Sequence, residues 1–424
     1  MDLKNSEKPG PRIFYGYYIV AASFVVLFLT GGALFALGVT FKPLMAEFGW
    51  SRSGISSVFF LYMAIFAGCL TFVGRIYDRF GPKWLIAVSG TILAIGYGGM
   101  FFINAFWQYA VTYGILTAIG ISGTTSALFG AVVSKWFDKG KGLAISLAIA
   151  GQGCGQFVMV PILTYTVHNY GWRISYLAIG FVLFVVIVSL ALFVFKGDPD
   201  DLGYKPLGHK METVTEHGPD TEPAIMETRD MGLKDAMKTG AFWLFLVFMF
   251  ICGSGDFLVS THLINLVTDH GVSAATAGHM MGWFGLMSLV GVVLAGPASD
   301  LIGNKIPIVL TFALRTFLFL MVFKYQTTFS FWLFSLGFGF TLLITAPLTA
   351  TLVGKLFGFS NMGILCGFIV FIHHLGGGLW GYMGGAIFDK TGSYQTAIIL
   401  SAVMAVIAIV STVFIREKRH YPAP

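Results

Sequence analysis

The residues of this chain best suited to chemistry are ionisable side chains placed inside long apolar stretches. Asp256 is the acid that lies deepest in such a stretch. An unpaired charge is unfavourable in an apolar medium, and burial favours the neutral form of a carboxylate. Asp256 is therefore predicted to carry a proton. The alternative is that Asp256 neutralises a buried base such as Arg315, which lies within another apolar stretch.

Histidine and glutamine side chains add proton-binding and hydrogen-bonding groups to the same kind of stretch. A histidine binds protons near neutral pH, but a buried histidine can equally be a hydrogen-bonded core residue, and both interpretations stay open. Neighbouring helix positions point about 100° apart, so only one of His373 and His374 is expected to face a cavity. Two roles stay open for Arg315, namely a structural ion pair and the binding of an anion. The predicted substrate-binding residues are His262, His279, His373, His374, Arg315, Gln152 and Gln156, with Phe35, Tyr62 and Tyr113 as an apolar lining.

The composition indicates which elements must position these residues. The 424 residues are 56% hydrophobic and 11% charged, whereas a soluble domain is roughly 25% charged. A helix needs about 20 apolar residues to cross a bilayer. The sequence predicts an all-α integral membrane protein with twelve transmembrane helices, at about 14–41, 52–74, 84–104, 107–134, 143–168, 173–195, 241–268, 274–297, 306–323, 330–354, 362–387 and 393–415.

The charged residues predict topology and exclude several classes of protein. Most of the 26 Lys and Arg residues fall in alternate loops, which predicts a multi-pass protein of the inner (plasma) membrane with both termini in the cytoplasm. The net charge of +6 is spread over these loops, so no nucleic-acid partner is expected. All four cysteines lie in apolar stretches, which argues against a disulfide scaffold. No nucleotide-binding loop, hydrolase elbow or zinc-protease motif is present, so neither enzyme activity, nor a cofactor, nor a metal is expected.

The two halves of the chain resemble each other. A polar connector, 197–240, separates residues 1–196 from residues 241–424, and each half is predicted to be a six-helix bundle. Parallel repeats of this kind occur in transporters that rock two halves about a central site. Glycine pairs in the first and seventh spans, Gly31–Gly32 and Gly253–Gly255, predict helix unwinding or close helix packing. At an offset of 222 residues, Gly74, Asp78, Gly81 and Lys83 match Gly296, Asp300, Gly303 and Lys305.

Two motifs carry a resemblance to known families. The run Gly74-Arg-Ile-Tyr-Asp78-Arg79-Phe-Gly81-Pro-Lys83 resembles the loop motif of the major facilitator superfamily. Within that superfamily, the run from Trp136 to Gly151 resembles the signature of the monocarboxylate transporter family, with an aromatic-Phe pair, spaced basic residues, Leu-Ala and small residues up to a Gly. The resemblance implies the major facilitator fold, with a small organic anion and a proton as partners.

The repeated loop motif also predicts a latch at the cytoplasmic mouth. Opposite charges and helix ends there can hold one state together and release it when the halves rock. The alternative is that these charges only anchor the loops and set topology. The predicted latch consists of Gly74, Asp78, Arg79, Lys83, Gly296, Asp300 and Lys305.

The chain departs from the family at its substrate positions. Animal monocarboxylate transporters carry a Lys in span 1 and an Asp-Arg pair in span 8, whereas this chain has Phe35 near the first position and Val292 and Gly296 at the others. Oxalate/formate exchangers use an Arg in span 8 and a Lys in span 11; the matching spans here hold His279 and the His373-His374 pair.

Together these features predict a secondary active transporter. The expected substrate is a small monocarboxylate such as lactate or pyruvate, moved by proton symport with alternating access. Two alternatives remain open. One is a proton-independent organic-anion exchanger of the oxalate/formate type, and the other is a membrane receptor or enzyme built on a transporter frame.

Overall fold

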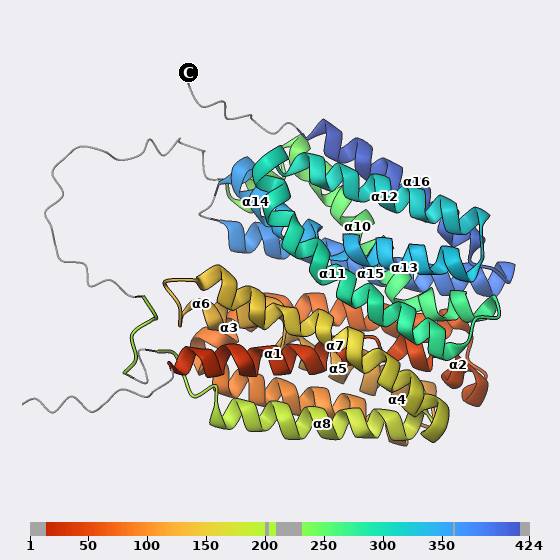
Figure 1. Ribbon diagram of the computed structural model, residues 1–424, viewed down its shortest axis with the longest axis horizontal. Coiled ribbons are helices and arrows are strands. Elements are labelled where there is room, and N and C mark those ends of the chain that lie inside the picture. The colour runs from red at the N-terminus through yellow and green to blue at the C-terminus, as the bar shows by residue number, and fades with distance from the viewer. Residues whose placement is uncertain (1–13, 200–202, 209–230, 359–360, 416–424) are drawn as a thin grey trace, which may run out of the picture.

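The computed structural model describes residues 14–199, 203–208, 231–358 and 361–415, and these residues are almost entirely helical. Helices α1–α8 lie together in one half of the molecule, and α10–α16 lie together in the other (Figure 1). The first half consists of α1 (Tyr15–Ala33), α2 (Ala36–Phe48), α3 (Arg52–Gly99), the 3-10 turn Met100–Phe102, α4 (Phe106–Tyr109), a π-helical segment (Ala110–Leu116), α5 (Thr117–Ser122), α6 (Ser126–Ser134), α7 (Lys141–Tyr170) and α8 (Trp172–Phe193). After α9 (Leu233–Ala236), the second half consists of α10 (Gly240–Asp269), α11 (Ala274–Ile302), α12 (Lys305–Lys324), α13 (Thr328–Leu342), α14 (Thr345–Phe357), α15 (Met362–Thr391) and α16 (Gln395–Phe414).

Eleven helical segments of the described chain are long and apolar enough to cross a membrane. One of them, Arg52–Phe102, contains two predicted spans, because Gly81 interrupts its helix with φ 71° and ψ 174°. Dividing this segment at Gly81 yields the twelve predicted spans. The all-α membrane fold is therefore confirmed.

The internal repeat is visible in the backbone as well as in the sequence. Gly81 turns the chain between two spans of the first half, and Gly303 does so in the second half with φ 77° and ψ 175°. Gly49 and Gly271 also match, with φ 68° and 80°. Glycine adopts positive φ without the steric penalty of a Cβ atom. The repeated glycines thus mark the same turns in both halves.

The two halves touch at one end of the helices and lie apart at the other. We call the end with the Gly49 and Gly271 turns the closed end, and the end with the Gly81 and Gly303 turns the open end. At the closed end α2 packs against α10, and α3 packs against α15. Towards the open end, a Cβ atom added at Gly74 of α3 or Gly367 of α15 would meet no heavy atom within 4 Å. The halves therefore diverge towards the open end, as the ribbons show (Figure 1).

Glycines let helices α1 and α7 pack backbone to backbone. A Cβ atom at Gly31 would lie 2.5 Å from the carbonyl oxygen of Gln152, and one at Gly155 would overlap the carbonyl oxygen of Phe28. The first span also breaks, between Ala33 and Ala36, so both predictions for its glycine pair are confirmed.

The matching glycines of the seventh span behave differently. Helix α10 is continuous, so of the two alternatives predicted for these glycines it does not show unwinding. Gly253 instead permits close packing, because a Cβ atom at this position would overlap the carbonyl oxygen of His373 in α15.

We expect Gly155→Ala to destabilise the protein, because its Cβ would overlap the backbone of α1. Overpacking of this kind costs about 1–3 kcal/mol, so the melting temperature in detergent should fall by a few degrees. Gly142→Ala, on the same helix, is the matched control, since its Cβ would meet no heavy atom within 4 Å. Equal losses in both variants would contradict the packing argument.

The predicted connector is not wholly solvated. Tyr204 stacks on Tyr15 with ring centroids 5.7 Å apart, and the Leu207 amide donates to the Trp136 carbonyl over 2.9 Å. Asp198 forms an ion pair with Lys135 over 2.5 Å. The first residues of the connector therefore pack on the first half. Residues 209–230 and both termini lie outside the described residues.

Candidate functional site

Asp256 and Arg315 form a buried ion pair inside the second half. Nη2 of Arg315 on α12 lies 2.7 Å from Oδ1 of Asp256 on α10, and the two side chains are 1% and 5% exposed. The contact is an ion pair between a guanidinium and a carboxylate. The sequence predicted Asp256 either as a proton carrier or as the partner of a buried base. The structure shows its pairing with the buried base Arg315.

The end of helix α13 supplies further partners for Arg315. Its Nε donates to Oγ1 of Thr341 over 3.0 Å, and its Nη2 donates to the Thr341 carbonyl over 3.0 Å. The last four carbonyls of a helix have no partner within the helix, and they carry partial negative charge. The guanidinium also lies 4.7 Å from the ring centroid of Phe338. In this conformation most donors of Arg315 are used inside the second half.

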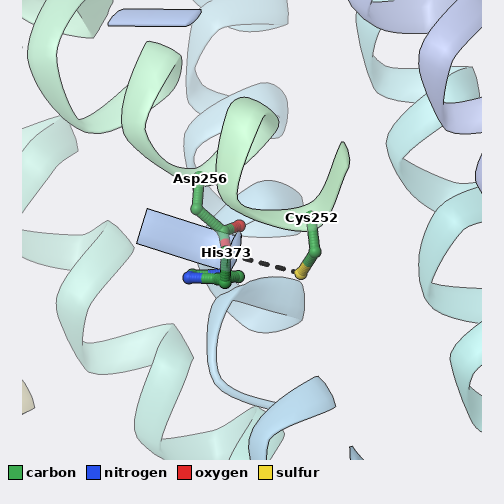
Figure 2. Close-up of side chains that lie close together, drawn as sticks. All are labelled: Cys252, Asp256 and His373. Atoms are coloured by element: carbon green, nitrogen blue, oxygen red, sulfur yellow. Dashed lines mark hydrogen bonds and ion pairs between the residues drawn. The ribbon is translucent and has the colours of Figure 1, made fainter. Parts of the chain in front are cut away.

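His373 and Cys252 complete the cluster around Asp256 (Figure 2). Nε2 of His373, on α15, donates to Oδ2 of Asp256 over 3.2 Å, and the Cys252 thiol donates to the same oxygen over 3.5 Å. Cys252 and Asp256 share one face of α10, because residues four apart lie one turn apart. The side chain of His373 is 17% exposed against 5% for Asp256. His373 is therefore the most accessible ionisable member of the cluster, which we call the Asp256 cluster: Cys252, Asp256, Arg315 and His373.

The two adjacent histidines point in different directions, as predicted. Nδ1 of His374 donates to the Val370 carbonyl over 2.8 Å within α15. The His374 ring lies 4.9 Å from the ring of Phe66 on α3, in the other half. His373 thus faces the interior of the second half, and His374 faces the first half.

His279 does not join the cluster. It is exposed on α11, on the same stripe as Trp283 and Val290, which are also exposed. Residues spaced by three or four positions lie on one helix face, and Trp283 on this face contacts Phe157 of α7 with ring centroids 5.2 Å apart. His279 therefore lies outside the cluster in this conformation, and its role in substrate binding stays a prediction.

A network of charges joins the two halves at the closed end. Arg52 of α3 forms an ion pair with Asp269 of α10 over 2.8 Å, and Lys42 of α2 lies 2.7 Å from the same carboxylate. The backbone amides of Arg52 and Ser53 donate to the Asp389 carboxylate of α15 over 3.1 and 2.8 Å. With Tyr394, which accepts from Nη1 of Arg52 over 2.7 Å, these side chains form what we call the closed-end network: Lys42, Arg52, Asp269, Asp389 and Tyr394.

His262 is attached to this network and not to the Asp256 cluster. Its Nε2 lies 2.8 Å from the Gly381 carbonyl and its Nδ1 lies 2.9 Å from the Tyr394 hydroxyl. A carbonyl only accepts, so we assign the proton to Nε2 and let Nδ1 accept from Tyr394. Burial raises the pKa of Tyr394, which keeps the proton on the hydroxyl. His262 is 3% exposed, so in this conformation it is a hydrogen-bonded core residue.

The other predicted lining residues lie in the first half. Nε2 of Gln156 donates across the halves to the Met281 carbonyl over 3.0 Å. Gln152 packs with its backbone against Gly31 of α1. Tyr62 and Tyr113 are buried and stack with ring centroids 5.7 Å apart, so they do not line open space here. Phe35 is buried at the break between α1 and α2.

The residues of the predicted latch lie at the open end. Asp78, Arg79 and Asp300 are exposed. Gly74 and Lys83 lie on α3, and Gly296 lies on α11. Nζ of Lys305 donates to the Ile415 carbonyl over 2.9 Å, within the second half. The latch stays a prediction for a state in which this end closes.

Sequence reasoning missed several residues that hold these sites together. The Tyr97 hydroxyl donates to the carbonyl of Ala33, the last residue of α1, over 2.7 Å. Cys252 was also missed, although it lies one helical turn before Asp256. Arg52 and Asp269 had a usable signal, because they flank the repeated turns at Gly49 and Gly271.

Comparisons with known proteins agree with this geometry. The chain is 26% identical over 395 residues to an uncharacterised MFS-type transporter, YcxA, of Bacillus subtilis (strain 168), covering 89% of this chain and 91% of that protein. It is 21% identical over 389 residues to monocarboxylate transporter 13 of Rattus norvegicus, covering 91% and 86%.

The fold is shared with solved transporters. The structure of a bacterial homologue of the human lysosomal transporter Spinster, in an inward-facing and occupied conformation, superposes with a TM-score of 0.74 at 13% identity over 96% of this chain and 97% of that one. The profile of the Major Facilitator Superfamily matches residues 23–264 and 245–424. The chain therefore belongs to the Major Facilitator Superfamily and is a transporter homologous to the monocarboxylate transporters.

Proposed function

We propose that the protein moves a small monocarboxylate together with a proton, and that the Asp256 cluster couples the two. The observation that carries the proposal is a buried carboxylate shared by two basic groups, Arg315 at 2.7 Å and His373 at 3.2 Å. Such charges are unfavourable in a membrane protein unless they are paired, and they commonly mark transport pathways. The similarity to monocarboxylate transporters supports an organic acid as the substrate.

Charge balance links proton binding to anion binding at this cluster. When Asp256 takes up a proton, Arg315 loses its counter-charge while it remains buried. A buried unpaired cation is strongly destabilising, so the site then favours a substrate carboxylate. One proton and one monocarboxylate together leave the net charge of the cluster unchanged.

His373 is the proposed route for the proton. It is the most exposed ionisable member of the cluster, and its Nε2 contacts Oδ2 of Asp256 directly. An imidazole can accept a proton at one nitrogen and release one from the other. His374, which faces Phe66 of the first half, is the proposed contact between this site and the rest of the pathway.

The proposed cycle rocks residues 1–196 against 241–424 about this site. The alternate loops rich in Lys and Arg support a plasma-membrane protein whose open end and both termini face the cytoplasm. The described conformation then faces inwards, held by the closed-end network. In the opposite state the predicted latch, with Asp78, Arg79 and Asp300, closes the cytoplasmic end.

Uptake into liposomes tests the proposal. Purified protein should accumulate labelled lactate or pyruvate when an inward proton gradient is imposed, and a protonophore should abolish the accumulation. Protein-free liposomes provide the background. Uptake that ignores the proton gradient but requires an internal counter-anion would establish the exchanger of the oxalate/formate type. Failure to move any labelled solute would favour the receptor or enzyme alternative.

A further inference from the structure

Three side chains that commonly ligate metals converge in the Asp256 cluster from two helices. Cys252 and Asp256 lie one turn apart on α10, and His373 reaches them from α15 (Figure 2). Their ligand atoms are a thiol sulfur, a carboxylate oxygen and an imidazole nitrogen, and all lie within 4.8 Å of one another. This convergence is not needed for the Asp256–Arg315 ion pair, which uses the other carboxylate oxygen.

Two of the three spacings between these atoms match a tetrahedral metal site, and the third lies within 4.8 Å. Zinc bonds of about 2.0 Å to nitrogen and oxygen and about 2.3 Å to sulfur place neighbouring ligand atoms about 3.3–3.6 Å apart. Oδ2 of Asp256 lies 3.2 Å from Nε2 of His373 and 3.5 Å from Sγ of Cys252. We propose that Cys252, Asp256 and His373 bind a borderline-soft divalent cation of the Zn²⁺ class.

The ligand set selects the class of ion. A thiolate and an imidazole favour Zn²⁺ and its soft relatives, whereas Mg²⁺ and Ca²⁺ require mostly oxygen ligands. Three protein ligands leave a fourth position for water or another small ligand. The partly exposed side of His373 provides the entry path.

The neighbouring guanidinium does not exclude the ion. Arg315 contacts Oδ1 of Asp256, which leaves Oδ2 for the metal. Its Nη1 also lies 3.6 Å from Sγ of Cys252, where its positive charge favours the thiolate form that binds a metal. Metal binding releases protons from its ligands. An ion that displaces the thiol proton of Cys252 and a second proton held by His373 leaves the net charge of the cluster unchanged.

The functional consequence rests on the proposed function of the cluster. A bound ion occupies the atoms of Asp256 and His373 that exchange the coupled proton. It also ties α10 to α15 at the point where Gly253 brings their backbones together. The site is therefore inhibitory: the ion competes with protons and stops coupled transport.

Binding of Cd²⁺ to the purified full-length chain in detergent tests the site without any transport measurement. Cadmium bound to a thiolate gives an ultraviolet charge-transfer band, and we expect one that Zn²⁺ abolishes and Mg²⁺ does not. Cys252→Ser should remove the band. His373→Gln should weaken Cd²⁺ binding more than about 100-fold, since even indirect partners of metal ligands are worth 10–100-fold. Cys69→Ser and Cys366→Ser are matched controls, because these cysteines are not among the three converging residues.

A second readout protects the test against variants that fold poorly. Zn²⁺ should raise the melting temperature of the wild type and of both controls, because a ligand that binds the folded state stabilises it, and should not raise that of Cys252→Ser. A wild-type chain without the band, or a band that survives Cys252→Ser, overturns the metal site. A chain that transports protons and anions but binds no Cd²⁺ overturns this inference alone, whereas a chain that binds Cd²⁺ but transports nothing overturns the proposed function and supports the site.

Discussion

Asp256→Asn is expected to abolish proton-driven accumulation of the anion and to weaken the fold. The substitution leaves Arg315, whose side chain is 1% exposed, without its counter-charge. Breaking a buried ion pair by removing one partner costs about 3–5 kcal/mol, so the melting temperature in detergent should fall clearly. Accumulation in liposomes should drop to the level of protein-free vesicles, while some anion exchange persists because exchange moves no net proton.

A charge-neutral double variant separates transport from folding. Asp256→Asn combined with Arg315→Gln removes both charges, and neutralising both members of a buried pair is far less destabilising than removing one. We expect the double variant to recover most of the lost stability but none of the accumulation. Recovery of both stability and accumulation would show that the Asp256–Arg315 pair is purely structural. Wild-type accumulation by Asp256→Asn alone would show that Asp256 has no part in the mechanism.

Arg52→Gln is expected to open the closed end. Arg52 contacts Asp269 at 2.8 Å and the Tyr394 hydroxyl at 2.7 Å, and both partners belong to the opposite half. Truncating one member of a buried, hydrogen-bonded charge pair between two surfaces costs about 2 kcal/mol or more, which is roughly a 30-fold change in the equilibrium. The population with this end open should therefore rise by a factor of that order.

Cysteine labelling at a buried position reports this opening. Thr261 of α10 is 3% exposed, and a Cβ atom at Gly38 of α2, in the other half, would lie 3.8 Å from its carbonyl oxygen. The labelling rate of Thr261→Cys by a thiol reagent, corrected for the parent chain, should rise when Arg52→Gln is added. Arg173→Gln is the matched control, since Arg173 pairs at 2.6 Å with Glu47 of its own half. Equal rates in the Arg52 and Arg173 variants would show that the closed-end network does not hold this end shut.

The fold was predictable because its main determinants are local. Backbone groups in lipid must find their partners within the same helix, so each long apolar stretch specifies one span without reference to the others. The turns at Gly81 and Gly303 were predictable from the repeat, because the same glycine at the same place allows the same positive φ. The place where Gly81 divides one long helix into two spans was therefore apparent before any coordinates.

The candidate site was predictable only in part. Asp256 was identifiable from the free-energy penalty of its burial, and Arg315 was identifiable as one possible partner. Cys252 was not, because a thiol in an apolar stretch has the pattern of a small core residue. Similarly, His279 and His373 both lie within apolar stretches of the sequence. In the structure, however, His279 is exposed on α11 and His373 contacts Asp256.

The sequence by itself determined twelve spans, their duplication and the presence of a few ionisable groups at depth, since hydrophobicity and glycine turns act within single segments. Only the tertiary structure decided which groups meet. The pairing of Asp256 with Arg315 depends on how α10 and α12 are rotated about their own axes. The pairing of Arg52 with Asp269 depends further on the tilt between the halves. Rotation and tilt arise from packing among many helices at once, and no single stretch of sequence encodes them.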